Sequence, residues 1–171
     1  MRLRLGLSIL FLAAACQAEL IGGQVVKVID GDTITVLDAG KVQHKVRLTG
    51  IDAPEKSQAF GQKSRASLAE LVAGRTVIVE TYKMDRHGRP IGKVLLNGQD
   101  VNIKQIRRGM AWYYRDYKRG LSASDKQSYD RAESNARAFR KGFWWIRVRC
   151  RHGSIGVPTG SDKNHCLEGT Q

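Results

Sequence analysis

Acidic side chains gather between positions 30 and 55 of this basic chain. Asp30 and Asp32 flank a glycine in the turn D-G-D, and Asp52 and Glu55 belong to the segment I-D-A-P-E. One arginine, Arg47, lies between the two acidic groups. Carboxylate oxygens are the ligands that hard cations such as calcium and magnesium prefer. The stretch therefore favours a cation site, although each segment taken alone is more often a turn or a strand exit.

Five short strands are predicted to position these side chains. Apolar and polar residues alternate along residues 21–29, 32–38 and 42–49, with D-G-D and D-A-G turns between them. Residues 75–82 are rich in β-branched side chains, and residues 91–96 end at an N-G turn. The pattern is typical of a mostly antiparallel sheet.

Three helices are predicted around these strands. The first covers residues 60–73, and the second covers residues 101–108 with Asp100 as its N-cap. The third begins near Ser124 and ends at Gly142, with a buried stripe of Tyr129, Ala132, Ala136 and Phe139. The F-W-W run that follows is expected to pack on the body of the protein. The element pattern indicates an α+β fold that suits a small closed barrel.

Composition favours a globular protein with a polyanionic partner. The chain has 171 residues, 42% of them hydrophobic, which is enough for one domain with short attachments. Its formal net charge is +13. Such a charge on a small domain favours nucleic acid, an anionic membrane or acidic glycans as partners.

The first 18 residues are predicted to be a signal peptide with cleavage after Ala18. A basic start precedes the apolar run 5–15, which is too short to span a bilayer, so no stable membrane span is expected. Lipid attachment at Cys16 is the less favoured alternative. Removal of residues 1–18 takes away two arginines and no acid, which leaves a net charge of +11. We therefore expect export to the periplasm or the extracellular space.

The remaining cysteines predict a disulfide in the C-terminal tail, residues 148–171. Cys150 and Cys166 form an even pair, and in an oxidising compartment they could close a short loop worth about 3 kcal/mol. A zinc site with His152 and His165 is less favoured, because the C-x-x-C spacing is absent.

Three blocks of sequence together resemble the micrococcal (staphylococcal) nuclease, or thermonuclease, family. They are V-I-D-G-D-T at 28–33, R-L-T-G-I-D-A-P-E at 47–55 and D-R-H-G-R at 85–89. The resemblance covers about residues 24–145. It implies an OB-fold, a five-stranded β-barrel with three α-helices, within a domain of residues 19–147. It also implies a monomeric, calcium-dependent enzyme that hydrolyses phosphodiester bonds of DNA and RNA with low sequence specificity.

The resemblance also implies a set of calcium ligands. Asp32 and Asp52 match the carboxylate ligands, and the backbone carbonyl of Ala53 matches a third ligand. The family often has threonine at that third position, which is tolerable because only the carbonyl is used. Asp30 matches a residue that shapes the site without necessarily touching the ion; a plain turn role is about as expected.

Three further side chains match the catalytic residues of the family. Glu55 matches the group proposed to activate or position water, and Arg47 and Arg89 match the two arginines that grip the phosphate. A planar guanidinium donates two hydrogen bonds to one phosphate and stays charged. Pro90 departs from the glycine of the best-known member and affects how Arg89 is aimed. The structural alternative for Arg47 is an ion pair with Asp52 or Glu55.

The resemblance also implies substrate contacts from Arg86, Tyr114 and Tyr117, of which Tyr117 aligns best with the aromatic residues that contact the nucleotide in the family. Aromatic faces beside arginines stack on the bases of single strands, so single-stranded nucleic acid is the favoured partner. Tyr114 could instead pack in the core, and His87 is expected to be a surface residue. The rival hypothesis is an OB-fold module that binds nucleic acid without catalysis.

Overall fold

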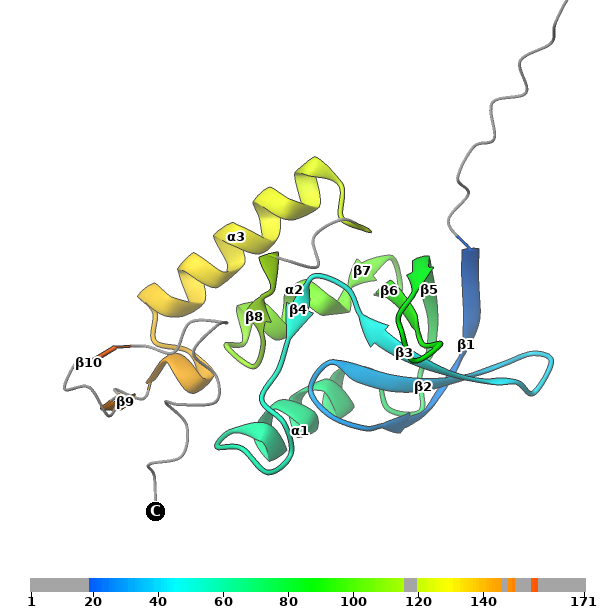
Figure 1. Cartoon of the computed structure of the whole chain (residues 1–171), viewed down its shortest axis with the longest axis horizontal. Helices are drawn as coiled ribbons and strands as arrows, with labels where there is room; N and C mark the ends of the chain where they lie inside the picture. The colour runs from blue at the N-terminus through cyan, green and yellow to red at the C-terminus, as the bar shows by residue number, and fades with distance from the viewer. Residues whose placement is uncertain (1–18, 116–119, 146–147, 150–154, 157–171) are drawn as a thin grey trace, which may run out of the picture.

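The structure is a computed structural model that describes residues 19–115, 120–145, 148–149 and 155–156 (Figure 1). The predicted signal peptide, Tyr117 and the predicted disulfide Cys150–Cys166 lie outside these residues. In the described part of the chain, no helix is both long enough and apolar enough to cross a membrane.

Five strands close into a barrel, as the sequence predicted. They pair in the order β3-β2-β1-β5-β6 through antiparallel ladders, and a parallel pair between β3 and β6 closes the circle. The closing pair sets Arg47 opposite Ile91 and Leu48 opposite Gly92. The strands are β1 (Glu19–Val28), β2 (Thr33–Asp38), β3 (Gln43–Leu48), β5 (Thr76–Met84) and β6 (Pro90–Leu96).

Short strands extend the barrel and tie later segments to it. β4 (Ile51–Asp52) pairs antiparallel with β8 (Trp112–Tyr113), and β7 (Gln99–Asp100) pairs with the end of β6. A separate two-stranded pair joins β9 (Val148–Arg149) and β10 (Ile155–Gly156). The β4–β8 pair matters for function, because it brings the segment after residue 111 against the segment that contains Asp52.

Three α-helices accompany the barrel within the described residues. α1 (Gly61–Val72) lies below the barrel in Figure 1, and α2 (Val101–Arg107) lies between the barrel and α3 (Ala123–Ala138). The Asp100 carboxylate accepts the Ile103 amide at 3.1 Å, which confirms the predicted N-cap. The N-cap of α3 is Ser122 and not Ser124, since the Ser122 hydroxyl accepts the Asp125 amide at 3.0 Å.

The main core joins apolar residues of the barrel strands to those of all three α-helices, and a second, smaller core is aromatic. The second core contains Trp112, Ala136, Phe143 and Trp144, with the Trp112 and Phe143 rings stacked at 4.4 Å. The prediction for the aromatic run is therefore confirmed at two of its three residues. It is wrong for Trp145, the last residue of the 3₁₀ helix η2 (Gly142–Trp145), which is 73% exposed.

Phe139 was also predicted to be buried and is 73% exposed. It is the C-cap of α3, where the chain leaves the helix, so the helical spacing that predicted a buried position no longer applies.

Candidate active site

The turn between β1 and β2 buries one of the predicted acids. Asp32 is 2% exposed, and its Oδ2 accepts the Ala53 amide at 2.8 Å. Its Oδ1 accepts the Thr33 hydroxyl at 3.0 Å, and its backbone carbonyl accepts the Leu48 amide at 2.8 Å. The structure thus brings the D-G-D turn and the I-D-A-P-E segment together, as the sequence predicted.

The glycine of this turn is required by its close neighbours. A Cβ on Gly31 would lie 1.8 Å from the Ser64 hydroxyl of α1 and 2.7 Å from the Ala53 side chain. The Gly31 carbonyl accepts a hydrogen bond of 2.9 Å from the side-chain amide of Gln105 in α2. The acidic turn therefore rests directly on two helices.

Arg47 joins the two predicted carboxylate ligands. Its Nη1 lies 3.0 Å from Asp32 Oδ1, and its Nη2 lies 2.7 Å from Asp52 Oδ1. The Asp52 side chain is 11% exposed, so both carboxylates are largely withdrawn from solvent. The ion pair considered for Arg47 with Asp52 is present, and Asp32 shares it.

Burial makes the Asp32 carboxyl a weaker acid than usual. Loss of solvation raises the pKa of Asp32 to about 7, against the opposing effect of the Arg47 charge, and nearby Asp30 raises it further. Asp30 is close because its carboxylate accepts the Asp32 amide at 3.1 Å, which is the turn role weighed for it. The single positive charge of Arg47 therefore does not fully offset the negative charges of Asp30, Asp32 and Asp52.

The residues at this position fit a hard cation. The two carboxylates of Asp32 and Asp52 offer oxygen donors only, which suits calcium. Among the described residues, no group of three or more His, Cys, Asp or Glu side chains could hold a metal ion. Any ion here would therefore depend on two carboxylates completed by carbonyl, water or phosphate oxygens. The Arg47 guanidinium, itself a cation, already binds both the Asp32 and the Asp52 carboxylate.

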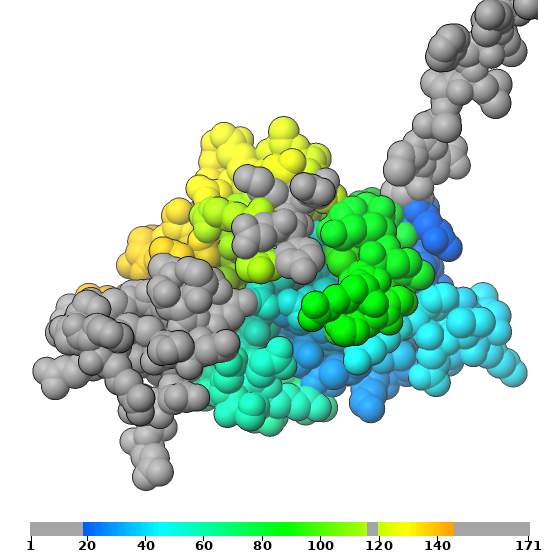
Figure 2. Space-filling model, viewed as in Figure 1, coloured from blue at the N-terminus to red at the C-terminus, as the bar shows by residue number. Residues whose placement is uncertain are grey.

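Arg89 faces the same cleft as Arg47, from the turn between β5 and β6. The cleft has a volume of about 460 Å³. Arg89 Nε donates to Asp85 Oδ2 at 2.6 Å, and no described residue binds its terminal nitrogens. Figure 2 shows the β5–β6 hairpin, in green, standing out from this face of the molecule. The cleft is lined by Arg47, Leu48, Thr49, Ile51, Asp52, Lys83, Met84, Asp85, Arg86, His87, Arg89, Ile91 and Tyr114.

The predicted substrate residues Arg86 and Tyr114 also line the cleft. The Tyr114 amide donates to the Gly50 carbonyl at 2.9 Å, which continues the β4–β8 pairing and places Tyr114 opposite Gly50, two positions before Asp52. His87 is exposed as expected, and Arg86 Nε donates to its Nε2 at 3.0 Å. Tyr114 is half-buried, and it lines the cleft directly after strand β8.

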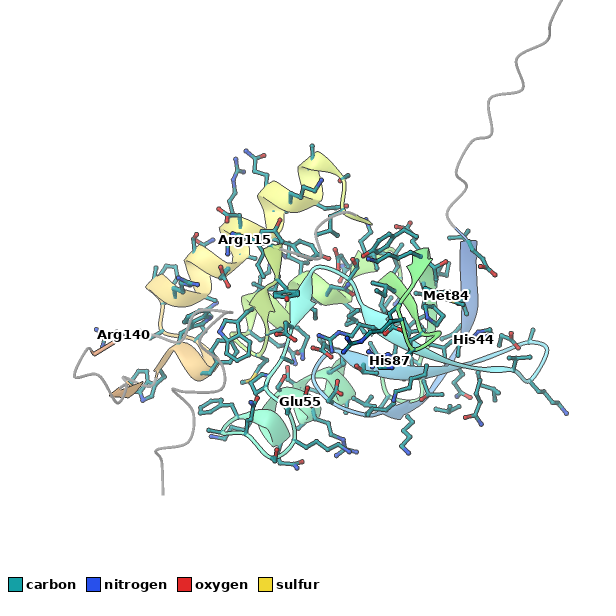
Figure 3. The ribbon with its side chains drawn as sticks, in the orientation of Figure 1. His44, Glu55, Met84, His87, Arg115 and Arg140 are labelled. Carbon is teal, nitrogen blue, oxygen red and sulfur yellow. The ribbon has the colours of Figure 1, made fainter. Side chains whose placement is uncertain are left out.

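Glu55 is not among the residues that line the cleft. It follows β4 on the segment before α1, where Figure 3 labels it, and its side chain is exposed. Its backbone amide donates to the Gln58 side chain at 2.8 Å, while no described residue hydrogen-bonds to its carboxylate. The local turn thus leaves the carboxylate open to solvent three residues after Asp52.

Sequence reasoning missed Asp85, Lys83 and Met84 as cleft residues. Asp85 was part of the D-R-H-G-R block but received no role. The turn pattern could have predicted a role for Asp85, because an aspartate that begins a tight turn often accepts hydrogen bonds from backbone amides two and four residues later.

Comparisons with known proteins agree with this arrangement. The model of the family described as "Staphylococcal nuclease homologue" matches residues 45–145. An "Uncharacterized endonuclease" of Haemophilus influenzae is 42% identical over 131 residues, 77% of this chain and 70% of that protein. "Protein ParB" of Escherichia coli is 42% identical over 153 residues, 84% of this chain and 83% of that protein. A "Micrococcal nuclease" of Shigella flexneri is 40% identical over 131 residues, 71% of this chain and 72% of that protein.

The matched region contains both cleft arginines and the segment from Asp52 to Glu55. The five-stranded β-barrel with its three α-helices is the fold that the resemblance led us to expect. The chain therefore belongs to the staphylococcal nuclease family and is a hydrolase of the nuclease type.

Proposed function

We propose that this protein is an exported, calcium-dependent nuclease that hydrolyses phosphodiester bonds of DNA and RNA with low sequence specificity. One observation carries the proposal. Arg47 and Arg89 line one cleft, and Arg47 also contacts the two buried carboxylates of Asp32 and Asp52. A phosphate in this cleft would meet two guanidinium groups beside a site that suits a divalent cation.

Asp32 and Asp52 would hold the calcium ion through their carboxylates, and Ala53 through its backbone carbonyl. Asp30 would support the turn and add negative charge without binding the ion. When bound, calcium supplies positive charge that stabilises negative charge on the phosphate oxygens. The raised pKa of Asp32, caused by its burial, supports a partner with more charge than one guanidinium.

Arg47 and Arg89 would bind the non-bridging oxygens of the scissile phosphate and stabilise the charge that grows in the transition state. Glu55 would accept a proton from the attacking water or orient that water. The exposed Glu55 carboxylate has no hydrogen bond to any residue that the structure describes, so it is available for this task. The reaction forms one P–O bond to the water oxygen and breaks one P–O ester bond, and the departing sugar oxygen takes up a proton from solvent to become a hydroxyl group.

Tyr114 and Tyr117 would stack on bases, and Arg86 would bind a neighbouring phosphate. These contacts use the faces of bases and the backbone, which every nucleotide offers, so they support low sequence specificity. They also favour single strands, whose bases are accessible. The high positive charge would add attraction that weakens as salt concentration rises.

We also propose residues 1–18 as the signal peptide, 19–147 as the nuclease domain and 148–171 as a tail joined by Cys150–Cys166, in a monomeric protein. The apolar run and the even cysteine pair support export. Mass spectrometry of the protein from the periplasm or the medium would test the cleavage site, the disulfide and lipid attachment at Cys16.

The function is tested with the protein lacking residues 1–18, on single-stranded DNA and on RNA, in calcium and then in excess EGTA. The Glu55→Gln variant removes the proposed base, and Glu70→Gln is its control, because Glu70 is an exposed acid on α1 outside the cleft. We expect cleavage of both substrates in calcium and its loss with EGTA. Glu55→Gln should be slower by about 10²–10⁴-fold, and Glu70→Gln unchanged. Tight binding without cleavage under any divalent ion would establish the non-catalytic module instead.

A further inference from the structure

The turn that carries Arg89 is closed by its own backbone. The Asp85 amide donates to the Arg89 carbonyl at 2.9 Å, and the Gly88 amide donates to the Asp85 carbonyl at 3.1 Å. Gly88 has a φ of +71°, a conformation that glycine adopts at little cost. The ends of this five-residue turn are therefore held together independently of the Asp85 side chain.

The Asp85 carboxylate adds three hydrogen bonds inside the turn. Oδ1 accepts the His87 amide at 2.8 Å and the Arg89 amide at 2.9 Å, and Oδ2 accepts Arg89 Nε at 2.6 Å. The side chain is 12% exposed. Burial alone would raise its pKa, but the bonds from Arg89 and His87 prevail and lower the pKa of Asp85 to about 2. The carboxylate is thus ionised throughout the ordinary pH range.

The two cleft arginines are held in opposite ways. Arg47 contacts Asp32 and Asp52 through its two terminal nitrogens. Arg89 is bound at Nε, and its two terminal nitrogens have no partner among the described residues. A guanidinium is planar, so a bond at Nε fixes its plane and the direction of both terminal nitrogens. A long arginine side chain without this bond would sample many orientations in the cleft.

We propose that Asp85 is a positioning residue that fixes the Arg89 guanidinium so that both terminal nitrogens point to the phosphate. The proposal rests on the phosphate-binding role of Arg89 in the function proposed above. It assigns a task to a residue that touches no reacting atom. It also explains why an ionised carboxylate is kept in a cleft intended for a polyanion, where its charge alone would repel the substrate.

This charge makes the sign of the effect informative. If Asp85 acted only as a negative charge, the isosteric Asp85→Asn change would improve substrate attraction and leave kcat equal or higher. If Asp85 positions Arg89, kcat falls while KM stays the same or decreases. Loss of alignment at one phosphate ligand is expected to lower kcat by about 10–100-fold.

The test measures kcat and KM of the calcium-loaded protein on single-stranded DNA for Asp85→Asn and Asp85→Ser. The serine variant keeps an acceptor for the backbone amides but has no partner for Arg89 Nε. Asp38→Asn is the matched control, because Asp38 also caps a hairpin turn, accepting the Val42 amide at 2.9 Å and pairing with His44 at 2.7 Å. Asp38 does not line the cleft, so its variant should behave as the wild type.

Both Asp85 variants are then combined with Arg89→Ala. A positioning role predicts that Asp85→Asn lowers kcat in the wild-type background and has no further effect when Arg89 is absent. An equal loss in both backgrounds would assign Asp85 a general structural role, and an unchanged or raised kcat would reduce it to a local charge. Either result overturns the proposal. A wild-type protein that cleaves nothing under any divalent ion would instead remove the proposed function on which it rests.

Discussion

The Gln105 side-chain amide donates a hydrogen bond of 2.9 Å to the carbonyl of Gly31, across 74 positions of the chain. The same amide donates to the Ser64 carbonyl at 3.1 Å, and its oxygen accepts the Ser67 hydroxyl at 2.7 Å. Gln105 is fully buried. A single side chain of α2 therefore fixes the turn that separates Asp30 from Asp32 and joins it to α1.

Replacing this residue with leucine should cost both stability and metal affinity. Gln105→Leu removes the hydrogen bonds to Gly31, Ser64 and Ser67 and leaves the buried Gly31 carbonyl without its partner, while the Ser67 hydroxyl still accepts Arg108 Nη1 at 3.2 Å. We expect the free energy of unfolding to fall by about 3 kcal/mol. The calcium concentration for half-maximal cleavage should rise, because the turn holding Asp32 is less fixed. Urea denaturation and calcium titration measure the two effects. Gln99→Leu, at an exposed position, is the control and should change neither.

Calcium should stabilise the protein through Asp52. A ligand present at 100 times its Kd adds about 2.7 kcal/mol to the stability of the folded state, which corresponds to a rise in Tm of about 10 °C. Asp52→Asn should abolish most of this rise, while Asp38→Asn should retain it. Differential scanning calorimetry with and without calcium measures the shift. An Asp52→Asn protein with the full wild-type shift would place the ion elsewhere.

Arg47→Met should separate the catalytic and structural contributions of this arginine. The methionine cannot bind phosphate, so we expect kcat to fall by about 10²–10³-fold. In EGTA, the buried carboxylates lose their counter-charge, and the variant should be less stable than the wild type by about 3 kcal/mol above neutral pH. Calcium should restore much of that stability. Thermal unfolding at pH 8 with and without calcium provides the measurement, and equal stability of the two proteins in EGTA would contradict it.

The low pKa of Asp85 predicts a contribution to acid stability with a definite sign. Its pKa is about 2 in the folded protein and has an ordinary value of 3.8. Between these values the unfolded chain binds more protons, so the contribution is complete above pH 3.8 and is lost as the pH falls through 2. The stability difference between wild type and Asp85→Asn should therefore shrink from pH 5 to pH 2. Urea denaturation at several pH values tests this, and a difference independent of pH would refute it.

Local patterns in the sequence were sufficient for the elements of the barrel. The predicted strands 21–29, 32–38 and 42–49 agree closely with β1, β2 and β3, because alternation and turn residues are read from neighbouring positions. The closing β3–β6 pair has no local signal and was not predicted; the family resemblance implied only that the strands close into an OB-fold barrel. The β4–β8 pair was missed, since two residues a strand are too few to show a period.

The site was predicted at the level of residues but not of contacts. The spacing of Asp32, Arg47 and Asp52 indicated a cation site, yet it could not show that one guanidinium binds both carboxylates. The Nε bond between Arg89 and Asp85 likewise depends on side-chain orientation, which sequence does not report. The predictions that Phe139 and Trp145 are buried were wrong for another reason. Both residues lie at the end of a helix, where helical spacing no longer determines which side of the helix a side chain occupies.

The parallel β3–β6 pair has a consequence for the order of events in folding. It joins positions 47 and 91, whereas the other barrel pairs apart from β1–β5 are hairpins between successive strands. Loop-closure entropy makes such distant pairings late in folding compared with hairpins. The two arginines therefore share a cleft only after the circle of strands is complete. In a refolding experiment, the recovery of cleavage should follow the recovery of β-structure, so that enzymatic activity is a kinetic marker of barrel closure.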